Sequence, residues 1–158
     1  MILIRPAARE DSALVAAFVR ELAEYEKLSH EVEASEETLA EALFTPNPRV
    51  FCDIAEWDGA PAGFALWFYT FSSFRGRHGI WLEDIFVRPQ FRGAGIGKAL
   101  LAHLARRCVA ERLGRFEWSV LAWNAPSIAF YEAQGATLMQ EWKICRMTGA
   151  ALETLAKK

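Results

Sequence analysis

The chain lacks the features that mark several large classes of protein. Its three cysteines, Cys52, Cys108 and Cys145, are odd in number and widely spaced, which fits neither a disulfide framework nor a zinc site. No apolar run reaches the ~18 residues of a membrane span, and the N-terminus has no basic stretch followed by a long apolar one. The net charge of −2 argues against a nucleic-acid partner. We expect a reduced, cytoplasmic protein with no membrane partner, no nucleic-acid partner and no metal.

The composition is that of a globular protein, with 53% hydrophobic and 13% aromatic residues among 158. We expect one domain over residues 1–158. Hydrophobic periodicity predicts strands at 2–5, 50–57, 62–71, 80–87, 115–122 and 138–147, with helices from 12, at 35–43, from 96 and at 125–134. This order predicts an α/β fold: a mixed central sheet of about six to seven strands flanked by helices.

The most informative segment is residues 82–97, where an apolar strand with two carboxylates leads into a glycine loop. Arg92 heads the loop, and Gly93, Gly95 and Gly97 keep side chains away from the first N–H groups of the helix that follows. Those N–H groups have no partner inside a helix, so a helix N-terminus of this kind binds anions. The segment therefore predicts a phosphate-bearing ligand.

Two familiar phosphate loops do not fit this segment. A Walker A loop continues with Lys-Ser/Thr, whereas Gly97 is followed by Lys98-Ala99, so there is no hydroxyl for magnesium. A dinucleotide-binding loop has the spacing Gly-x-Gly-x-x-Gly, which Gly93, Gly95 and Gly97 do not have. From these residues alone, a glycine-rich turn without a ligand remains open.

A second motif follows about thirty residues later. It has the pattern Asn-x-x-Ser-x-x-Phe-Tyr-x-x-x-Gly-Ala and begins at Asn124. Asn124 is a strong N-cap candidate, Pro126 is tolerated in the first helical turn, and Gly135 is a plausible stop after the helix. The motif therefore predicts a short helix of about three turns.

The two motifs together resemble those of the GNAT superfamily of acyl-CoA-dependent N-acetyltransferases. The resemblance covers almost the whole chain and is nearest to the spermidine/spermine and thialysine N-acetyltransferase branch, through Tyr25-Glu26, Trp81 to Val87 and Trp123-Asn124. It implies the GNAT fold and acetyl-CoA as co-substrate. It also implies a homodimer, because that branch forms homodimers and the apolar 138–147 segment reads as an edge that needs covering.

The resemblance also implies roles for particular residues. Tyr131 corresponds to the tyrosine that protonates the leaving CoA thiolate. The positions that would bind the cofactor are Ile85, Phe86, Val87, Arg92, Gly93, Ala94, Gly95, Ile96, Gly97, Lys98, Asn124, Ser127 and Tyr131. Those expected to bind the acceptor are Glu83, Asp84, Tyr25, Glu26 and Trp81.

Acyl transfer to an amine requires a base, because only the neutral amine attacks the thioester. An alkylammonium has a pKa near 10.4, so making it neutral at pH 7.4 costs about 4 kcal/mol. We expect Glu83 to hold the amine and take its proton, directly or through water. Asp84 should then lie on the other face of the strand, because side chains alternate, and one of the two should orient the substrate.

The choice of acceptor depends on two groups of charges. Eight acidic residues fall within residues 21–41, which favours a cationic amine, whereas Arg75, Arg77 and His78 would repel a long polyamine and could clamp a carboxylate. A diamine, polyamine or thialysine/lysine-like amino acid is the expected acceptor, by direct attack in a ternary complex. A protein-directed acetyltransferase and a non-catalytic acyl-CoA-binding sensor remain the alternatives.

Overall fold

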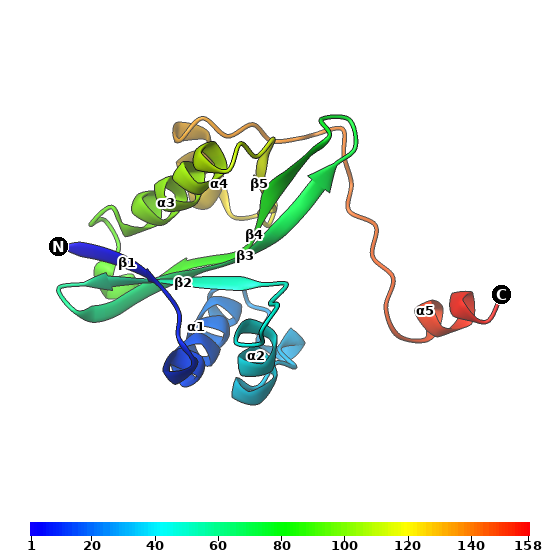
Figure 1. Ribbon diagram of the computed structural model, residues 1–158, viewed down its shortest axis with the longest axis horizontal. Coiled ribbons are helices and arrows are strands. Elements are labelled where there is room, and N and C mark those ends of the chain that lie inside the picture. Colours follow the sequence, from blue (N-terminus) through cyan, green and yellow to red (C-terminus); the bar gives the residue numbers. More distant parts are fainter. The chain divides into compact units, whose positions relative to one another are not determined.

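The computed structural model describes residues 1–158, which divide into two compact units, 1–121 and 122–158. The first unit holds one sheet whose strands follow the order β1-β2-β3-β4-β5 (Figure 1). Its strands are β1 (Ile2–Pro6), β2 (Phe51–Trp57), β3 (Ala60–Ser72), β4 (Arg77–Val87) and β5 (Phe116–Trp118). Neighbouring strands are antiparallel except for β4 and β5, so the sheet is mixed, as the hairpin-connected pattern predicts.

The sheet has five strands rather than the six to seven expected. The segment 138–147 forms no strand, although its apolar residues favour one. A strand exists only where its backbone N–H and C=O groups pair with another strand, and no strand of the chain pairs with this segment. β5 is also shorter than the expected 115–122, because its pairing with β4 ends at Leu82.

Helices cover both faces of the sheet. Helices α1 (Ser12–Tyr25) and α2 (Glu36–Leu43) lie on one face and α3 (Ile96–Ala110) on the other (Figure 1). Short 3₁₀ turns stand at Arg9–Asp11, Ser29–Glu31 and Pro89–Phe91. Ser35 caps α2, accepting a hydrogen bond from the Thr38 N–H at 3.2 Å.

The core under α1 fixes that helix to the sheet. Phe18 of α1 stacks on Phe64 of β3 with ring centroids 5.1 Å apart, and both side chains are fully buried. Val15 and Ile54 are fully buried as well. Each such side chain contributes about 1.5–3 kcal/mol through burial. The C-terminal end of α1 is therefore held at a defined place over the sheet.

A β-bulge interrupts β4 at Glu83. Leu66 of β3 pairs with Asp84, the next residue, Trp67, pairs with Leu82, and Glu83 has no partner. Residues directly opposite share a face, so Asp84 lies on the same face as Leu66, under α1 and α2. Leu82, paired with Trp67, lies on the α3 face. Because of this extra residue, the pairing of β4 with β3 shifts by one residue between the two halves of the strand.

The second unit, residues 122–158, contains two short helices, α4 (Ala125–Ala133) and α5 (Gly149–Ala156). Asn124 caps α4 through its side-chain oxygen, which accepts a hydrogen bond from the Ser127 N–H at 3.3 Å, as the motif predicts. Gly135 has φ +93° just after the helix, which also agrees with the prediction. No apolar side chain of this unit is buried.

Candidate active site

The glycine loop has the geometry of an anion site. Gly93 and Gly95 have φ of +82° and +84°, and Gly95 is the N-cap of α3. A Cβ at either position would meet no atom within 4 Å, so the backbone conformation, and not lack of space, requires glycine there. Ile96, Gly97 and Lys98 form the first turn of α3, whose N–H groups have no partner within the helix.

Arg92 ties this loop to the rest of the site. Its Nε donates a hydrogen bond of 2.9 Å to the carbonyl oxygen of Val87. Its guanidinium carbon lies 5.0 Å from the centroid of the Tyr25 ring and 5.5 Å from that of the Phe86 ring. The sequence predicts only a positive charge here. The structure adds that this charge lies between the end of α1 and the end of β4.

The end of β4 offers an open backbone edge beside the loop. β5 pairs with β4 only from Ile80 to Leu82, so residues 83–87 have β3 on one edge and no strand on the other. On the β3 side the strands approach closely at Gly63, where a Cβ would lie 2.4 Å from the carbonyl oxygen of Phe86. The backbone of Ile85, Phe86 and Val87 is thus placed at an edge where a ligand could add hydrogen bonds.

Three carboxylates gather where α1 meets β4. Burial first, and then the charges of Glu83 and Glu26, raise the pKa of Asp84 to about 7. Burial also raises the pKa of Glu26, which caps the C-terminal end of α1. An acidic side chain at that end of a helix faces the negative end of its dipole, so this position favours the neutral form further.

The bulge changes the expected relation between the two acids of β4. Strict alternation would put Glu83 and Asp84 on opposite faces, and this expectation is wrong because the register shifts at Glu83. Asp84 lies on the α1 face, and the Glu83 carboxylate accepts a hydrogen bond of 2.9 Å from Nε1 of Trp81. Trp81 pairs with Phe68, two residues from Leu66 and so on the same face.

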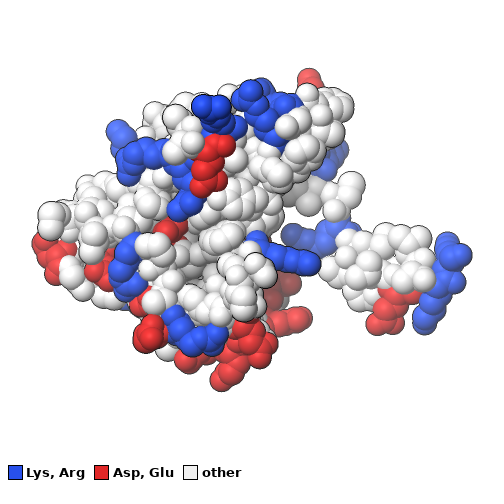
Figure 2. Space-filling view, in the orientation of Figure 1, with Lys and Arg blue, Asp and Glu red and all other residues white.

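The expected acceptor residues therefore come together in the first unit. Trp81, Glu83 and Asp84 lie in the middle of β4, while Tyr25 and Glu26 end α1. Acidic side chains gather over α1 and α2 in the lower part of the space-filling view (Figure 2). This end of the molecule is suited to a cationic ligand.

Arg88 positions α1 against β4, and the sequence analysis missed it. Its guanidinium makes two hydrogen bonds to Glu21, Nε to Oε2 at 3.0 Å and Nη2 to Oε1 at 2.8 Å. It also lies over the Phe18 ring, 4.6 Å from the centroid. An arginine before a proline carries no pattern that would identify a bidentate partner 67 residues away.

The remaining motif residues belong to the second unit. Asn124 is buried and caps α4, Ser127 lies in the first turn, and Tyr131 lies in the last. The Tyr131 carbonyl oxygen accepts hydrogen bonds from the N–H groups of Gln134 and Ala136, which close the helix. The cofactor-binding role of all three and the acid role of Tyr131 stay predictions.

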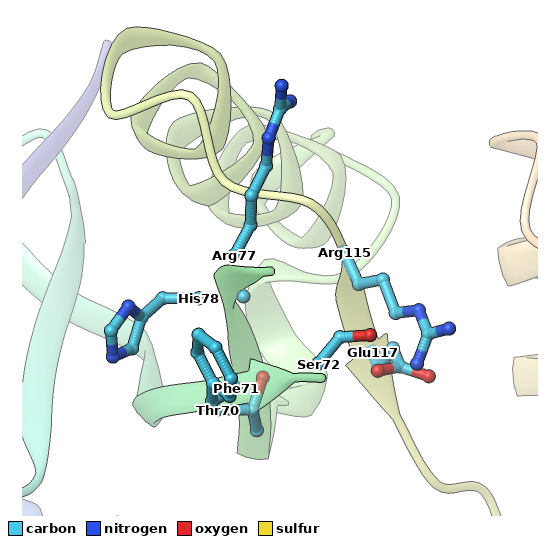
Figure 3. A pocket seen from close by; sticks show the side chains of 8 residues that line it. Thr70, Phe71, Ser72, Arg77, His78, Arg115 and Glu117 are labelled. Atoms are coloured by element: carbon cyan, nitrogen blue, oxygen red, sulfur yellow. The ribbon is translucent and has the colours of Figure 1, made fainter. Parts of the chain in front are cut away.

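The cations that could clamp a carboxylate lie elsewhere. A small pocket is lined by Thr70, Phe71, Ser72, Arg77, His78, Gly79, Arg115 and Glu117 (Figure 3). The side chains of Arg77, His78 and Arg115 point in three different directions from it. Arg77 precedes Glu83 by six residues of strand, which is about 20 Å. This cluster is too distant to bind the same small molecule as Glu83 within one chain.

No group of three or more histidine, cysteine, aspartate or glutamate side chains is arranged to hold a metal ion. None of the helices combines the length and the apolar character needed to cross a membrane.

Comparison with known proteins relates the chain to a family. The acetyltransferase (GNAT) family matches residues 15–136. Thialysine N-epsilon-acetyltransferase of Sus scrofa is 37% identical over 168 residues, covering 99% of this chain and 98% of that protein. L-ornithine N5-acetyltransferase of Arabidopsis thaliana is 32% identical over 199 residues, covering 98% and 87% respectively.

Solved structures show the same fold. An integron cassette protein from the mobile metagenome of V. cholerae superimposes with a TM-score of 0.81 at 29% identity, covering 99% of this chain and 98% of that one. An aminoglycoside acetyltransferase from a soil metagenome has a TM-score of 0.74 at 13% identity, covering 94% and 95%. At that identity the second likeness concerns the fold alone.

Proposed function

The chain belongs to the GNAT family of acetyltransferases and is an N-acetyltransferase, and on this premise we propose that it transfers the acetyl group of acetyl-CoA to the terminal amine of a small diamino acid or diamine. The observation that carries the proposal is the cluster of Glu26, Glu83 and Asp84, which adjoins the glycine loop through Tyr25, the neighbour of Glu26, whose ring lies beside Arg92 at the head of the loop. A cationic acceptor and a phosphate-bearing donor would bind at adjoining places.

The proposed donor site uses the backbone more than side chains. The pyrophosphate of CoA would lie on the N–H groups of the first turn of α3, whose approach Gly93 and Gly95 leave open. The pantetheine arm would hydrogen-bond to the free edge of residues 85–87. An N–H group at this edge would also stabilise the oxyanion that forms when the thioester is attacked.

The proposed reaction joins one acyl transfer to three proton transfers. A carboxylate of the acidic cluster takes one proton from the acceptor ammonium, and the neutral amine attacks the thioester carbon. The C–N bond forms and the C–S bond breaks. The CoA thiolate takes a proton from the Tyr131 hydroxyl, which regains one as the product nitrogen becomes an amide. The family resemblance of the second motif supports this role of Tyr131.

Direct transfer is favoured over an acetyl-cysteine intermediate. Burial is the main cause that raises the pKa of both the Cys52 and the Cys108 thiols, which disfavours the reactive thiolate. Cys145 is exposed but belongs to no recognisable nucleophile motif. The amine would therefore attack acetyl-CoA itself in a ternary complex.

The acceptor is proposed from charge and from the relatives. Thialysine and ornithine, named for two relatives, are both amino acids with a second, terminal amine. Three carboxylates at the site suit that amine. Arg77 and His78 lie too far from Glu83 to repel a diamine or polyamine bound there. Diamines and polyamines therefore belong in the test beside the diamino acids.

The test is a turnover screen with thiol release as the readout. Thialysine, lysine, ornithine, short diamines and spermidine are each offered with acetyl-CoA, and a lysine-containing peptide serves as the protein-like acceptor. We expect thiol release with at least one small amine and far less with the peptide. Peptide turnover alone would indicate a protein-directed enzyme. Tight CoA binding without any turnover would indicate a sensor.

The donor site is tested by a matched glycine pair. Gly95→Val and Gly76→Val both place a side chain at a positive φ in open space, at +84° and +60°. Only Gly95→Val would obstruct the phosphate site, so we expect CoA affinity to fall at least tenfold in that variant and to stay unchanged in Gly76→Val. Equal affinities by calorimetry would remove the pyrophosphate assignment.

We propose a homodimer as well. Large apolar side chains crowd the end of the chain, at Leu138, Met139, Trp142, Ile144, Met147, Leu152 and Leu155. Their own unit has no core to bury them, so another surface must cover them. Light scattering at micromolar concentration distinguishes the two sources of cover: a dimer mass supports the proposal, and a monomer mass indicates that the chain covers its own end.

A further inference from the structure

The two neighbouring acids of β4 have different surroundings. Glu83 stands in the bulge, is exposed, and has its carboxylate held by the Trp81 indole N–H at 2.9 Å. Asp84 is half-buried and lies opposite Leu66, a residue of the core under α1. Burial disfavours the charged form of Asp84, whereas the side chain of Glu83 is in contact with solvent.

The groups that face Asp84 are mostly acidic. Glu83 comes from its own strand and Glu26 from the end of α1, and each carboxylate raises the pKa of Asp84. The charge of Asp84 in turn raises the pKa of the Cys52 thiol, which lies on β2. The two arginines at this end are engaged elsewhere: Arg88 binds Glu21, and Arg92 donates to the Val87 carbonyl. A proton on Asp84 would relieve this crowding of charge.

We propose that Asp84, and not Glu83, receives the ammonium proton of the acceptor, while the carboxylate of Glu83 binds that ammonium. The inference rests on the proposed function and assigns the step that it left to the acidic cluster. The N–H bond of the ammonium breaks and an O–H bond forms on Asp84. The proton passes to water after the amide product has left, so Asp84 returns to its charged form.

The surroundings of each acid suit its proposed role, Asp84 as the base and Glu83 as the group that binds the ammonium. A base works best when its pKa lies near the operating pH, and about 7 for Asp84 meets that condition. Trp81 fixes the direction of the Glu83 carboxylate at the exposed mouth of the site. An incoming ammonium would meet Glu83 first and transfer its proton to the more buried acid beside it.

The experiment compares Asp84→Asn with Glu83→Gln over pH 5.5 to 9.5, after the screen has identified an acceptor. We expect kcat/KM of the wild type to rise with pH to a plateau, with a midpoint near 7. In Asp84→Asn this midpoint should vanish, kcat should fall ~100-fold or more at pH 7.5, and the rate should keep rising towards the pKa of the amine. Glu83→Gln should raise KM and retain a midpoint, moved to lower pH because the Glu83 charge no longer raises the pKa of Asp84.

A second acceptor separates proton transfer from a structural role. An analogue whose amine has a pKa below 6 is already neutral at pH 7.5, so Asp84→Asn should slow it less than tenfold. Melting curves and CoA titrations check that the variants fold, and Asp84→Ser is the alternative if Asp84→Asn does not.

Two results would overturn the inference: a midpoint near 7 that survives in Asp84→Asn, or an equal loss of rate with both amines. Either would leave the acetyltransferase proposal standing. That proposal fails separately, when the wild type releases no thiol with any amine.

Discussion

Two clusters of polar side chains lie on opposite faces of the same sheet; one is built from hydrogen-bonded pairs, whereas the other brings like charges together. Under α3, the Asp53 carboxylate is buried and accepts a hydrogen bond of 2.7 Å from Nε1 of Trp67. Under α1, Asp84 has two carboxylates for neighbours. The first arrangement stabilises the folded state, and the second destabilises it.

The cluster under α3 is continuous. Arg107 lies over the Trp67 ring at 5.0 Å and donates a hydrogen bond of 2.9 Å to Glu111, which also accepts one of 2.7 Å from the Tyr69 hydroxyl. His103 Nε2 stands 3.5 Å from Asp53 but has no hydrogen-bond partner. The comparison shows that hydrogen-bonded pairs hold a fold together, whereas carboxylates packed against one another mark where a cationic ligand is expected.

The largest difference should appear between two tyrosines. Tyr131→Phe removes the proposed acid, so thiol release should fall by roughly 10²–10⁴ while acetyl-CoA affinity changes little. Tyr69→Phe, the matched control, removes the hydroxyl bound to Glu111 and should leave the rate within about twofold. Equal rates for Tyr131→Phe and the wild type from pH 6 to 9 would show that Tyr131 is not the acid.

The next effect concerns stability on the α3 face. Asp53→Ala leaves the buried Trp67 N–H without its acceptor, which should cost about 3 kcal/mol and lower Tm by roughly 10 °C. Thermal unfolding at pH 7.5 measures the loss. Asp84→Ala under the same conditions should lose far less, and a loss as large as that of Asp53→Ala would mean that the two faces are not different in kind.

The third effect is a stability that depends on pH. The pKa of Asp84 is raised from 3.8 to about 7 in the folded protein. The folded state therefore holds more protons between these values, and Asp84 lowers stability progressively as pH rises through that window.

Asp84→Asn removes this penalty. The variant should match the wild type near pH 4 and be more stable at pH 8, by an upper limit of about 4 kcal/mol at 1.36 kcal/mol for each unit of pKa. Melting temperatures at the two pH values measure it. A constant difference between them would contradict the raised pKa.

The smallest effect uses two tryptophans that each donate to a carboxylate. Trp67→Phe leaves the buried Asp53 without a donor and should cost about 1–2 kcal/mol. Trp81→Phe breaks the exposed bond to Glu83 and should change stability by less than about 0.5 kcal/mol. Urea denaturation resolves both, and similar losses would mean that burial does not distinguish the two bonds.

Much of the fold follows from local pattern. The helices α1 to α4 and the strands β1 to β4 lie where periodicity, Ser35, Asn124 and the glycines place them, because each depends mainly on its own residues. The segment 138–147 does not, since a strand needs a partner that its own sequence cannot supply. The short β5 reflects the same dependence on pairing.

The sequence predicts which residues belong to the candidate site but not how they are arranged. The motifs identified Tyr25, Glu26, Trp81, Glu83 and Asp84. In the structure Trp81 binds Glu83, Asp84 interacts with Glu83 and Glu26, and Tyr25 lies beside Arg92. The bulge escaped notice, although Ile80, Leu82 and Phe86 already read as one apolar face with Asp84 between them. The charged Asp84 at an apparent core position was the signal in the sequence that could have revealed the bulge.

Glu83 is also the one residue of β4 that the ladder with β3 does not use. Deleting it would restore an uninterrupted ladder in which Leu82 still pairs with Trp67 and Asp84 with Leu66, so every later side chain of the strand would keep its side. Phe86 would stay opposite Phe64 in the core under α1, and the chain would enter the glycine loop as before. The extra residue therefore adds a carboxylate without being needed by the fold, and its deletion should remove that carboxylate while leaving the core and the loop in place.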